Sequence, residues 1–196
     1  MCHGTDMDFI MHEIRPQDVT GKTVIEVGAY DVNGSAKPHV MDMNPESYLG
    51  TDIREGPRVD LVIDACDLPV LGEFDLVIST EMLEHAEFWR EAMYGMITVI
   101  KPGGILFLTT RSPGFHYHDF PSDHWRYSVE DMGNILRGAG LDIIILKPDP
   151  SPHEPGVYAK ARKPLGWTWP EDIGWDNIIL VKPVPPELNQ QIPNTM

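Results

Sequence analysis

The sequence predicts a single α/β domain built on a doubly wound, mainly parallel sheet. Two observations favour this fold class. Several short apolar runs each end at a polar residue, and longer stretches with helical apolar spacing lie between them. In such a sheet, ligands bind outside the carboxyl ends of the strands. Because a polar residue recurs at that end of each run, we expect one shared site along one edge of the sheet.

The predicted elements follow one another with short connections. The strands cover residues 23–27, 48–52, 58–63, 73–79, 105–110, 141–146 and 156–161. The helices cover residues 6–14, 35–43, 86–100 and 128–139. The Lys-Pro-Gly-Gly run at 101–104 should end the long third helix, since glycine and proline favour helix termination. Ser128 and Asp131 have the spacing of a capping box for the fourth helix.

Three regions are expected along the chain. Residues 1–19 should form an N-terminal helix, which either packs on the domain or serves as a lid over the site. Residues 20–163 should form the main domain. Residues 164–196, rich in tryptophan and proline, should be a tail that packs on that domain.

Composition limits the classes of partner. The formal net charge of -15 opposes binding to nucleic-acid phosphate or to an anionic membrane surface. The two cysteines make no disulfide framework, and no apolar run approaches the roughly 18 residues of a membrane span. We therefore expect a cytoplasmic protein that binds no membrane and is an unlikely partner for nucleic acid.

The residues after the first two strands indicate the class of ligand. Asp52 lies 24 residues after Gly28, which is close to the spacing of a carboxylate that binds a ribose diol. The loop after Gly28 lacks the middle glycine of a dinucleotide site, and Gly34-Ser35 lacks the lysine of a P-loop. Acids such as Glu26 and Asp64 would repel a diphosphate. They suit an adenosine with a cationic end, as in S-adenosylmethionine.

At these positions the chain resembles the class I S-adenosylmethionine-dependent methyltransferases, in particular the ubiquinone-biosynthesis-like small-molecule group. The matching blocks run in the family's order from about residue 20 to 162. They are Val-Ile-Glu-Val-Gly at 24–28, Leu-Gly-Thr-Asp at 49–52, the block at 63–69, the block at 74–85 that ends in Glu-His, and Lys-Pro-Gly-Gly at 101–104. The loop from Tyr30 to Gly34 departs from the family pattern.

The resemblance implies a Rossmann-like sheet of seven strands with the last one antiparallel, and S-adenosylmethionine as cofactor. It places Gly28 under the methionine part, Asp52 at the ribose, and Asp64 with Ala65 at the adenine. The residues expected to contact the cofactor are Glu26, Gly28, Ala29, Tyr30, Gly34, Asp52, Ile53, Asp64, Ala65, Ser79, Thr80 and Glu81.

Four histidines are candidate bases for the reaction: His85, His116, His118 and His124. Imidazole titrates near neutral pH, so one of them could take a proton from the acceptor as the methyl group arrives. His-x-His at 116–118, with Asp119 and Asp123, could also hold a metal. No metal site is predicted, because loop histidines are more often solvated or hydrogen-bonded locally.

The predicted function is methyl transfer to an oxygen or nitrogen of a small polar molecule, with a sugar or secondary metabolite favoured. A nucleic-acid or protein methyltransferase is one alternative. The other is a non-catalytic module that keeps the cofactor within an assembly. The identity of the acceptor depends on the pocket shape that the loops create, and no general rule derives that shape from a loop's sequence. The sequence also leaves open whether several copies of the chain associate.

Overall fold

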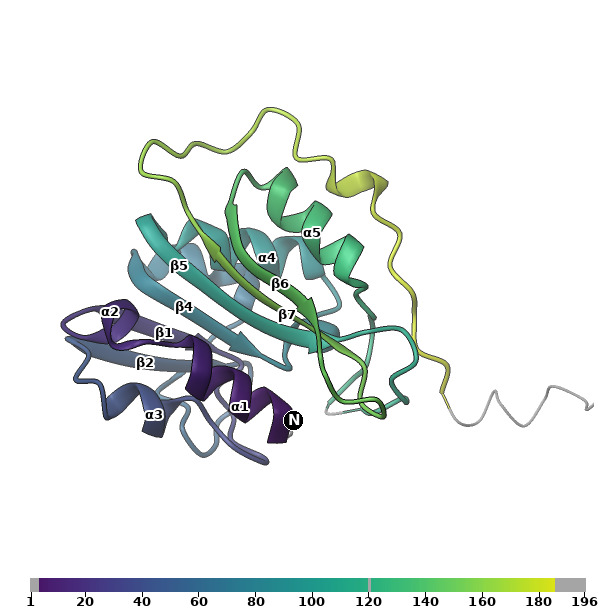
Figure 1. The fold of residues 1–196 in the computed structure, drawn as a ribbon, viewed down its shortest axis with the longest axis horizontal. Helices are drawn as coiled ribbons and strands as arrows, with labels where there is room; N and C mark the ends of the chain where they lie inside the picture. Colours follow the sequence, from purple (N-terminus) through teal and green to yellow (C-terminus); the bar gives the residue numbers. More distant parts are fainter. Residues whose placement is uncertain (1–3, 120, 186–196) are drawn as a thin grey trace, which may run out of the picture.

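A seven-stranded sheet lies between two layers of helices (Figure 1). The computed structural model describes residues 4–119 and 121–185. The strands are β1 (Thr23–Val27), β2 (Ser47–Asp52), β3 (Leu61–Val62), β4 (Phe74–Thr80), β5 (Ile100–Arg111), β6 (Asp142–Pro148) and β7 (Gly156–Arg162). Their order is β3-β2-β1-β4-β5-β7-β6, with β7 antiparallel to both neighbours and the other pairs parallel. The predicted fold class, with an antiparallel last strand, is confirmed.

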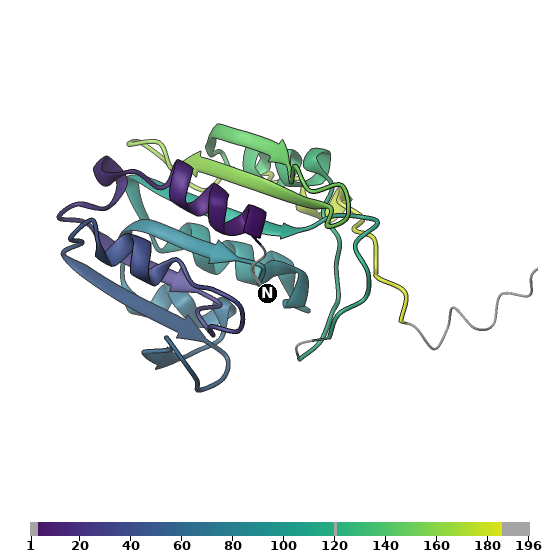
Figure 2. The same cartoon turned by 60° about the horizontal axis from the view of Figure 1, so that its bottom comes forward.

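Each face of the sheet is covered by its own helices (Figures 1 and 2). The helices α1 (Gly4–Glu13), α2 (Pro16–Val19) and α3 (Lys37–Met41) cover one face, and α4 (Trp89–Thr98) and α5 (Val129–Gly138) cover the other. Neighbouring residues of β1 therefore enter different apolar clusters: Val24 packs with Phe9 and Ile10 of α1, whereas Ile25 packs with the α4 side. Burial on both faces explains why the central strands are continuous apolar runs.

Two predicted strands differ by several residues in length from the observed ones. The third was predicted over 58–63 but pairs only at Leu61–Val62, because Arg58 has φ of 72° and both paired residues are exposed at the sheet edge. The fifth begins at Ile100 rather than at 105. The Lys-Pro-Gly-Gly run therefore lies within β5, where the pairing with β4 shifts register after Phe74.

The long helix begins later than predicted. A single 3-10 turn, η2 (Leu83–His85), follows β4, and Ala86 is extended, so α4 starts at Trp89 and ends at Thr98. The predicted capping box of α5 is confirmed, since Ser128 and Asp131 each accept the other's backbone N–H. Pro16 ends α1 as predicted and also starts the short α2.

The tail crosses the outer side of α5 (Figure 1). Trp167, Trp169 and Trp175 pack against the same apolar cluster as α4 and α5. The indole N–H of Trp175 donates to the Ile135 carbonyl at 3.0 Å. Residues 186–196 of the predicted tail and Cys2 lie outside the described residues.

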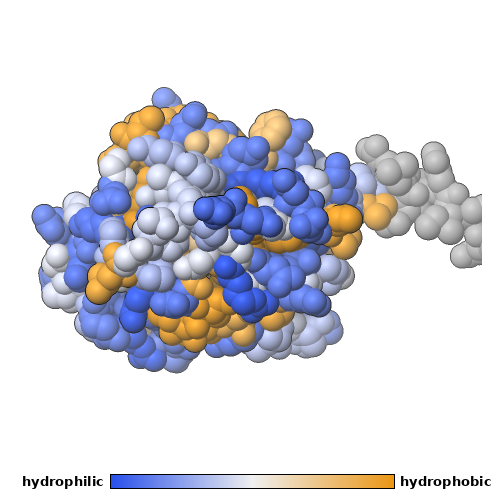
Figure 3. Space-filling model, turned by 90° about the horizontal axis from the view of Figure 1, so that it is seen from above, coloured by the Kyte–Doolittle hydropathy of each residue, from blue (hydrophilic) through white to orange (hydrophobic). Residues whose placement is uncertain are grey.

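The face in Figure 3 is mainly hydrophilic, with separate hydrophobic patches. This mixture is ordinary for a globular surface. Among residues 4–119 and 121–185, no helix is both long and apolar enough to cross a membrane.

Candidate active site

A pocket of about 290 Å³ opens where β1, β2 and β4 end. Its walls come from the loops after these strands, from the segment between η2 and α4, and from the long loop after β5. The lining residues are Glu26, Val27, Gly28, Ala29, Tyr30, Val32, Asn33, Gly34, Asp52, Ile53, Arg54, Ile63, Asp64, Ala65, Cys66, Thr80, Glu81, Met82, His85, Ala86, Glu87, Phe88, Pro121, Ser122 and His124.

The pocket brings together almost all of the residues predicted to contact a cofactor. Glu26, Gly28, Ala29, Tyr30, Gly34, Asp52, Ile53, Asp64, Ala65, Thr80 and Glu81 all line it. Ser79 does not line the pocket and is fully buried within β4. The reason is strand geometry, because Ser79 and Thr80 are neighbours on β4 and successive side chains point to opposite faces.

Gly28 forms a close-packed wall of the pocket. Its φ is 82°, and a Cβ atom added there would lie 2.5 Å from the Cβ of Met82. A side chain at this position would therefore meet both a conformational penalty and a steric clash. The backbone N–H groups of Gly28 and Ala29 both donate to the Thr51 carbonyl at 2.9 Å, which joins the loop after β1 to β2.

The loop from Tyr30 to Gly34 has a path that the family pattern did not predict. Asp31 stabilises it, because its Oδ1 accepts the backbone N–H of Gly34 at 2.9 Å. Arg58 lies 3.5 Å from the other carboxylate oxygen of Asp31. The Tyr30 ring lies 5.0 Å from the guanidinium of Arg54, so an aromatic and a cation close this side of the pocket.

Asp52 ends β2 with its carboxylate held by backbone N–H donors. Oδ2 accepts from Tyr30 at 3.3 Å and Oδ1 accepts from Arg54 at 3.1 Å. Asp64 instead caps the following 3-10 helix, η1 (Ala65–Leu71), by accepting the Cys66 N–H at 2.9 Å. Both carboxylates line the pocket, and their spare lone pairs can accept further hydrogen bonds.

Glu26 is a buried acid at the floor of the pocket. Its side chain accepts hydrogen bonds from the Tyr48 hydroxyl and from the Ala36 backbone at 3.4 Å. Burial raises the pKa of Glu26 to about 7, and the hydrogen bonds from Tyr48 and Ala36 oppose that rise only in part. A cationic group bound beside Glu26 would favour the ionised carboxylate.

The four candidate histidines fall into two groups. His85 and His124 line the pocket, whereas His116 and His118 do not. The ring of His116 stacks on Phe115 with centroids 4.3 Å apart. The Nδ1 atom of His118 lies 3.2 Å from Oδ2 of Asp123. The ring centroids of His118 and His85 are 4.7 Å apart.

Arg126 fixes the long loop after β5. It is buried, pairs with Asp123, and donates to the carbonyls of Phe115 and His116. These contacts give Arg126 a structural role in the loop. The loop is also held by Glu84, whose carbonyl accepts the backbone N–H groups of His124 and Trp125.

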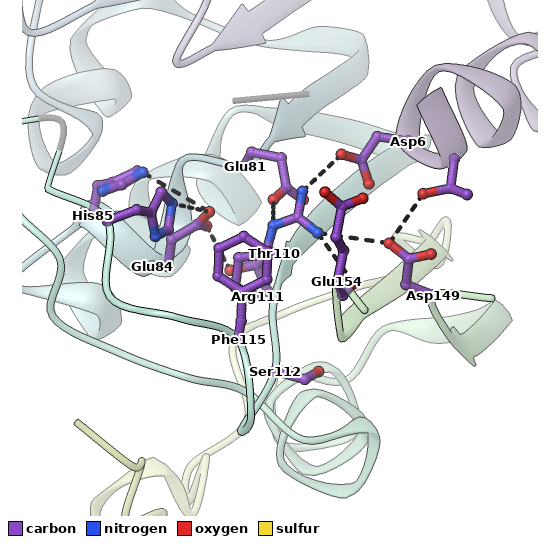
Figure 4. Close-up of polar contacts among 12 residues, drawn as sticks. Asp6, Glu81, Glu84, His85, Thr110, Arg111, Ser112, Phe115, Asp149 and Glu154 are labelled. Atoms are coloured by element: carbon purple, nitrogen blue, oxygen red, sulfur yellow. Dashed lines mark hydrogen bonds and ion pairs between the residues drawn. The ribbon is translucent and has the colours of Figure 1, made fainter. Parts of the chain in front are cut away.

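A buried ionic cluster beside the pocket was not predicted from the sequence (Figure 4). Arg111, at the end of β5, pairs with Asp6 of α1 at 2.9 Å, with Glu81 after β4, and with Asp149 at 3.6 Å. Burial raises the pKa of Glu81 well above its ordinary value, and the charges of Glu84 and Asp6 outweigh the opposing effect of Arg111. Glu81 also has φ of 53°, a strained backbone for a residue with a side chain.

The chain has the fold of several solved methyltransferases. An S-adenosylmethionine-dependent methyltransferase from Mesorhizobium loti is 16% identical, with a TM-score of 0.63, over 82% of this chain and 98% of that one. The N-methyltransferase NodS from Bradyrhizobium japonicum, solved with S-adenosyl-l-homocysteine, is 17% identical, with a TM-score of 0.61, over 83% and 89%.

A third similar structure contains two bound small molecules. The 1,6-didemethyltoxoflavin-N1-methyltransferase from Burkholderia thailandensis, solved with 1,6-didemethyltoxoflavin and S-adenosylhomocysteine, is 16% identical. Its TM-score is 0.57 over 74% of this chain and 72% of that one. At these identities the likeness shows a shared fold. No curated protein matches the chain.

Family membership comes from the sequence itself. The profile of the family described as a methyltransferase domain matches residues 2–144, which include every strand that contributes to the pocket. The seven-stranded sheet and its strand order agree with that match. This chain therefore belongs to the S-adenosylmethionine-dependent methyltransferases, and its cofactor is S-adenosylmethionine.

Proposed function

We propose that this methyltransferase acts on an oxygen or nitrogen of a small polar molecule, with a sugar or secondary metabolite as the favoured acceptor. The observation that carries the proposal is the acidic, glycine-walled pocket at the strand ends. Glu26, Asp52 and Asp64 present carboxylates along it. Acids in this arrangement suit a ligand with an ammonium group, a ribose diol and an amino-substituted base.

Each wall of the pocket has a role in this proposal. Asp52 accepts hydrogen bonds from the two ribose hydroxyls, and Glu26 faces the amino group of the methionine part. Gly28 allows the cofactor to approach the backbone closely. On the opposite side, Phe88, Ser122 and His124 form a polar and aromatic boundary where a small acceptor binds.

The protein's contribution to catalysis is mainly alignment and exclusion of water. S-adenosylmethionine supplies an already activated methyl group. Held by Glu26, Gly28 and Asp52, the cofactor would give its methyl carbon to the acceptor's oxygen or nitrogen, and its sulfur would keep the electron pair of the broken carbon–sulfur bond. The acceptor's proton passes to a base, for which His85 and His124 are the candidates that line the pocket.

Replacing Asp52 with alanine tests the cofactor site. The variant loses the carboxylate that accepts two hydrogen bonds from the ribose. Hydrogen bonds to a charged group contribute about 1.5–3 kcal/mol each, so we expect at least about hundredfold weaker binding. Titration calorimetry with S-adenosylhomocysteine measures the affinity. Asp67→Ala is the matched control, because Asp67 is exposed nearby and does not line the pocket. Equal affinity for the wild type and Asp52→Ala would contradict this assignment.

Transfer of a labelled methyl group tests the class of acceptor. The protein is incubated with labelled S-adenosylmethionine and separate panels of sugars, hydroxylated metabolites, amines, RNA and total protein. We expect transfer to a member of the small-molecule panels. Transfer to RNA or protein alone would replace the proposal with the macromolecular alternative. Cofactor binding without transfer to any panel would favour a non-catalytic module.

A further inference from the structure

Three side chains that could ligate a metal ion converge beside the pocket. Glu84 and His85 belong to η2, and His118 comes from the loop after β5. The Nε2 atoms of His85 and His118 lie 3.9 and 3.8 Å from Oε1 of Glu84. One ligand atom from each residue falls within 4.8 Å of the others. Figure 4 shows Glu84 and His85 turned toward each other, on the side of the cluster away from Asp6.

The remaining polar atoms of these side chains lie against other polar groups. The Nδ1–H of His85 donates to the Ser122 carbonyl, and His118 Nδ1 lies 3.2 Å from the Asp123 carboxylate. The second oxygen of Glu84 accepts from the Thr110 hydroxyl at 2.7 Å. Metal-bound histidines are commonly oriented in this way, with the far ring nitrogen donating to a carbonyl or carboxylate. The arrangement leaves the Nε2 atoms of both histidines close to one carboxylate oxygen of Glu84, at 3.9 and 3.8 Å.

Two of these converging atoms are buried without a hydrogen-bond partner among the described residues. They are Oε1 of Glu84 and Nε2 of His118. Glu84 is completely buried, and an unsatisfied carboxylate oxygen at such a site is costly.

We propose that Glu84, His85 and His118 bind a divalent transition metal ion, with Zn²⁺ the best match to two imidazoles and one carboxylate. Zinc takes such ligands at about 2.0–2.2 Å in a tetrahedron, which puts ligand atoms roughly 3.4 Å apart. The Nε2 atoms of His85 and His118 lie 3.9 and 3.8 Å from Oε1 of Glu84, so small side-chain rotations would bring them to this separation. Three protein ligands leave a coordination position for water or substrate. His85 also lines the pocket, and with its Nε2 on the ion, His124 is the candidate base that keeps a free role there.

This set differs from the metal pattern read from the sequence. That pattern combined His116 and His118 with Asp119 and Asp123. Here Asp123 is already paired with Arg126, and the ring of His116 stacks on Phe115. Of the four residues in the sequence pattern, His118 alone belongs to the metal-ligating group that the described residues contain, with Glu84 and His85.

Cobalt titration tests the site directly. The tag-free protein is treated with a chelator, dialysed and titrated with Co²⁺, whose visible absorption reports its coordination. We expect one equivalent to bind with a four- or five-coordinate spectrum, and Zn²⁺ to displace it. His118→Ala should weaken binding at least tenfold. His116→Ala, in the same loop but outside the group, should bind like the wild type. Equal affinity in His118→Ala and the wild type would refute the site.

A second variant separates lost ligation from lost folding. His118→Cys supplies a thiolate in place of the imidazole, so it should regain Zn²⁺ binding and give a sulfur-to-cobalt charge-transfer band that the wild type lacks. Circular dichroism and the thermal midpoint of each apo variant establish that it is folded. A folded Cys variant without the new band would also refute the assignment. The titration measures ion binding alone, so its failure leaves the methyl-transfer proposal unchanged.

Discussion

Glu26 is a residue whose acid–base behaviour is set by burial. Its side chain lies at the floor of the pocket, 2% exposed, and burial raises its pKa to about 7. In the unfolded chain the same carboxyl titrates near its ordinary pKa of about 4.5. Between these two values the folded protein keeps a proton that the unfolded chain has lost.

This difference predicts how stability depends on pH in the cofactor-free protein. Because folding takes up a proton between about pH 4.5 and 7, raising the pH through this window lowers the free energy of unfolding. The full effect is roughly 3 kcal/mol by pH 7 and above, and it is absent below pH 4.5. Glu26→Gln cannot titrate, so the difference in stability between the variant and the wild type should grow in the variant's favour as pH rises.

Urea unfolding of both proteins at pH 5, 6 and 7 measures this difference. Comparing the two proteins at each pH cancels the titration of the histidines, which both share. A difference that stays constant across the three pH values would show that the folded state does not hold a proton on Glu26.

The position of a residue could be predicted from the sequence where the sheet topology alone decides it. Asp52 and Asp64 follow parallel strands, whose carboxyl ends must meet along one edge, so their place in the pocket could be read from the sequence. The contacts of Arg111 could not be read in this way. Its partners Asp6 and Asp149 are separated from it by 105 and 38 positions, and no local pattern relates them.

At the scale of elements, α1 is joined to the pocket wall through a buried charge. Asp6 of α1 accepts from Arg111 at 2.9 Å and from the Tyr158 hydroxyl at 2.8 Å, and all three side chains are buried. Arg111 also pairs with Glu81, which lines the pocket. The helix therefore contributes to the electrostatics of the site as well as to the apolar cluster formed by Phe9 and Ile10.

Replacing Asp6 with asparagine should destabilise the fold. Removing one partner of a buried ion pair costs about 3–5 kcal/mol when the other charge is left alone. Arg111 keeps Glu81 and Asp149, so we expect a smaller loss, about 2–3 kcal/mol. Chemical unfolding measures it, and Asp8→Asn on the exposed side of the same helix is the control. Equal stability of the two variants would mean that the pairing with Arg111 contributes nothing.

The sequence predicted elements best where both faces are buried. The central strands β1 and β4 are continuous apolar runs, and both were predicted within one residue. The edge strand β3 was predicted too long, because two exposed residues carry no burial pattern to mark its ends. The start of α4 was predicted three residues too early, at Ala86, because the extended backbone of Ala86 leaves no mark in the apolar spacing.

At the scale of the whole molecule, the tail is part of the main hydrophobic core. Trp175 is 2% exposed and packs against Trp89 with ring centroids 5.8 Å apart. Arg90 of α4 donates to the Trp175 carbonyl at 3.0 Å. The tail thus closes the face of the sheet that α4 and α5 leave incomplete.

Trp175→Ala tests whether the tail belongs to the cooperative fold. The substitution removes a buried indole and its hydrogen bond to the Ile135 carbonyl, so the free energy of unfolding should fall by about 3–5 kcal/mol. Leu165→Ala, also in the tail but 83% exposed, should change stability by less than about 0.5 kcal/mol. Urea unfolding followed by far-ultraviolet circular dichroism reports the whole domain without relying on tryptophan fluorescence. If the tail only rested on a domain that is complete without it, the unfolding midpoint of Trp175→Ala would match that of Leu165→Ala. A single transition at a lower urea concentration would instead establish that the tail and the sheet unfold together.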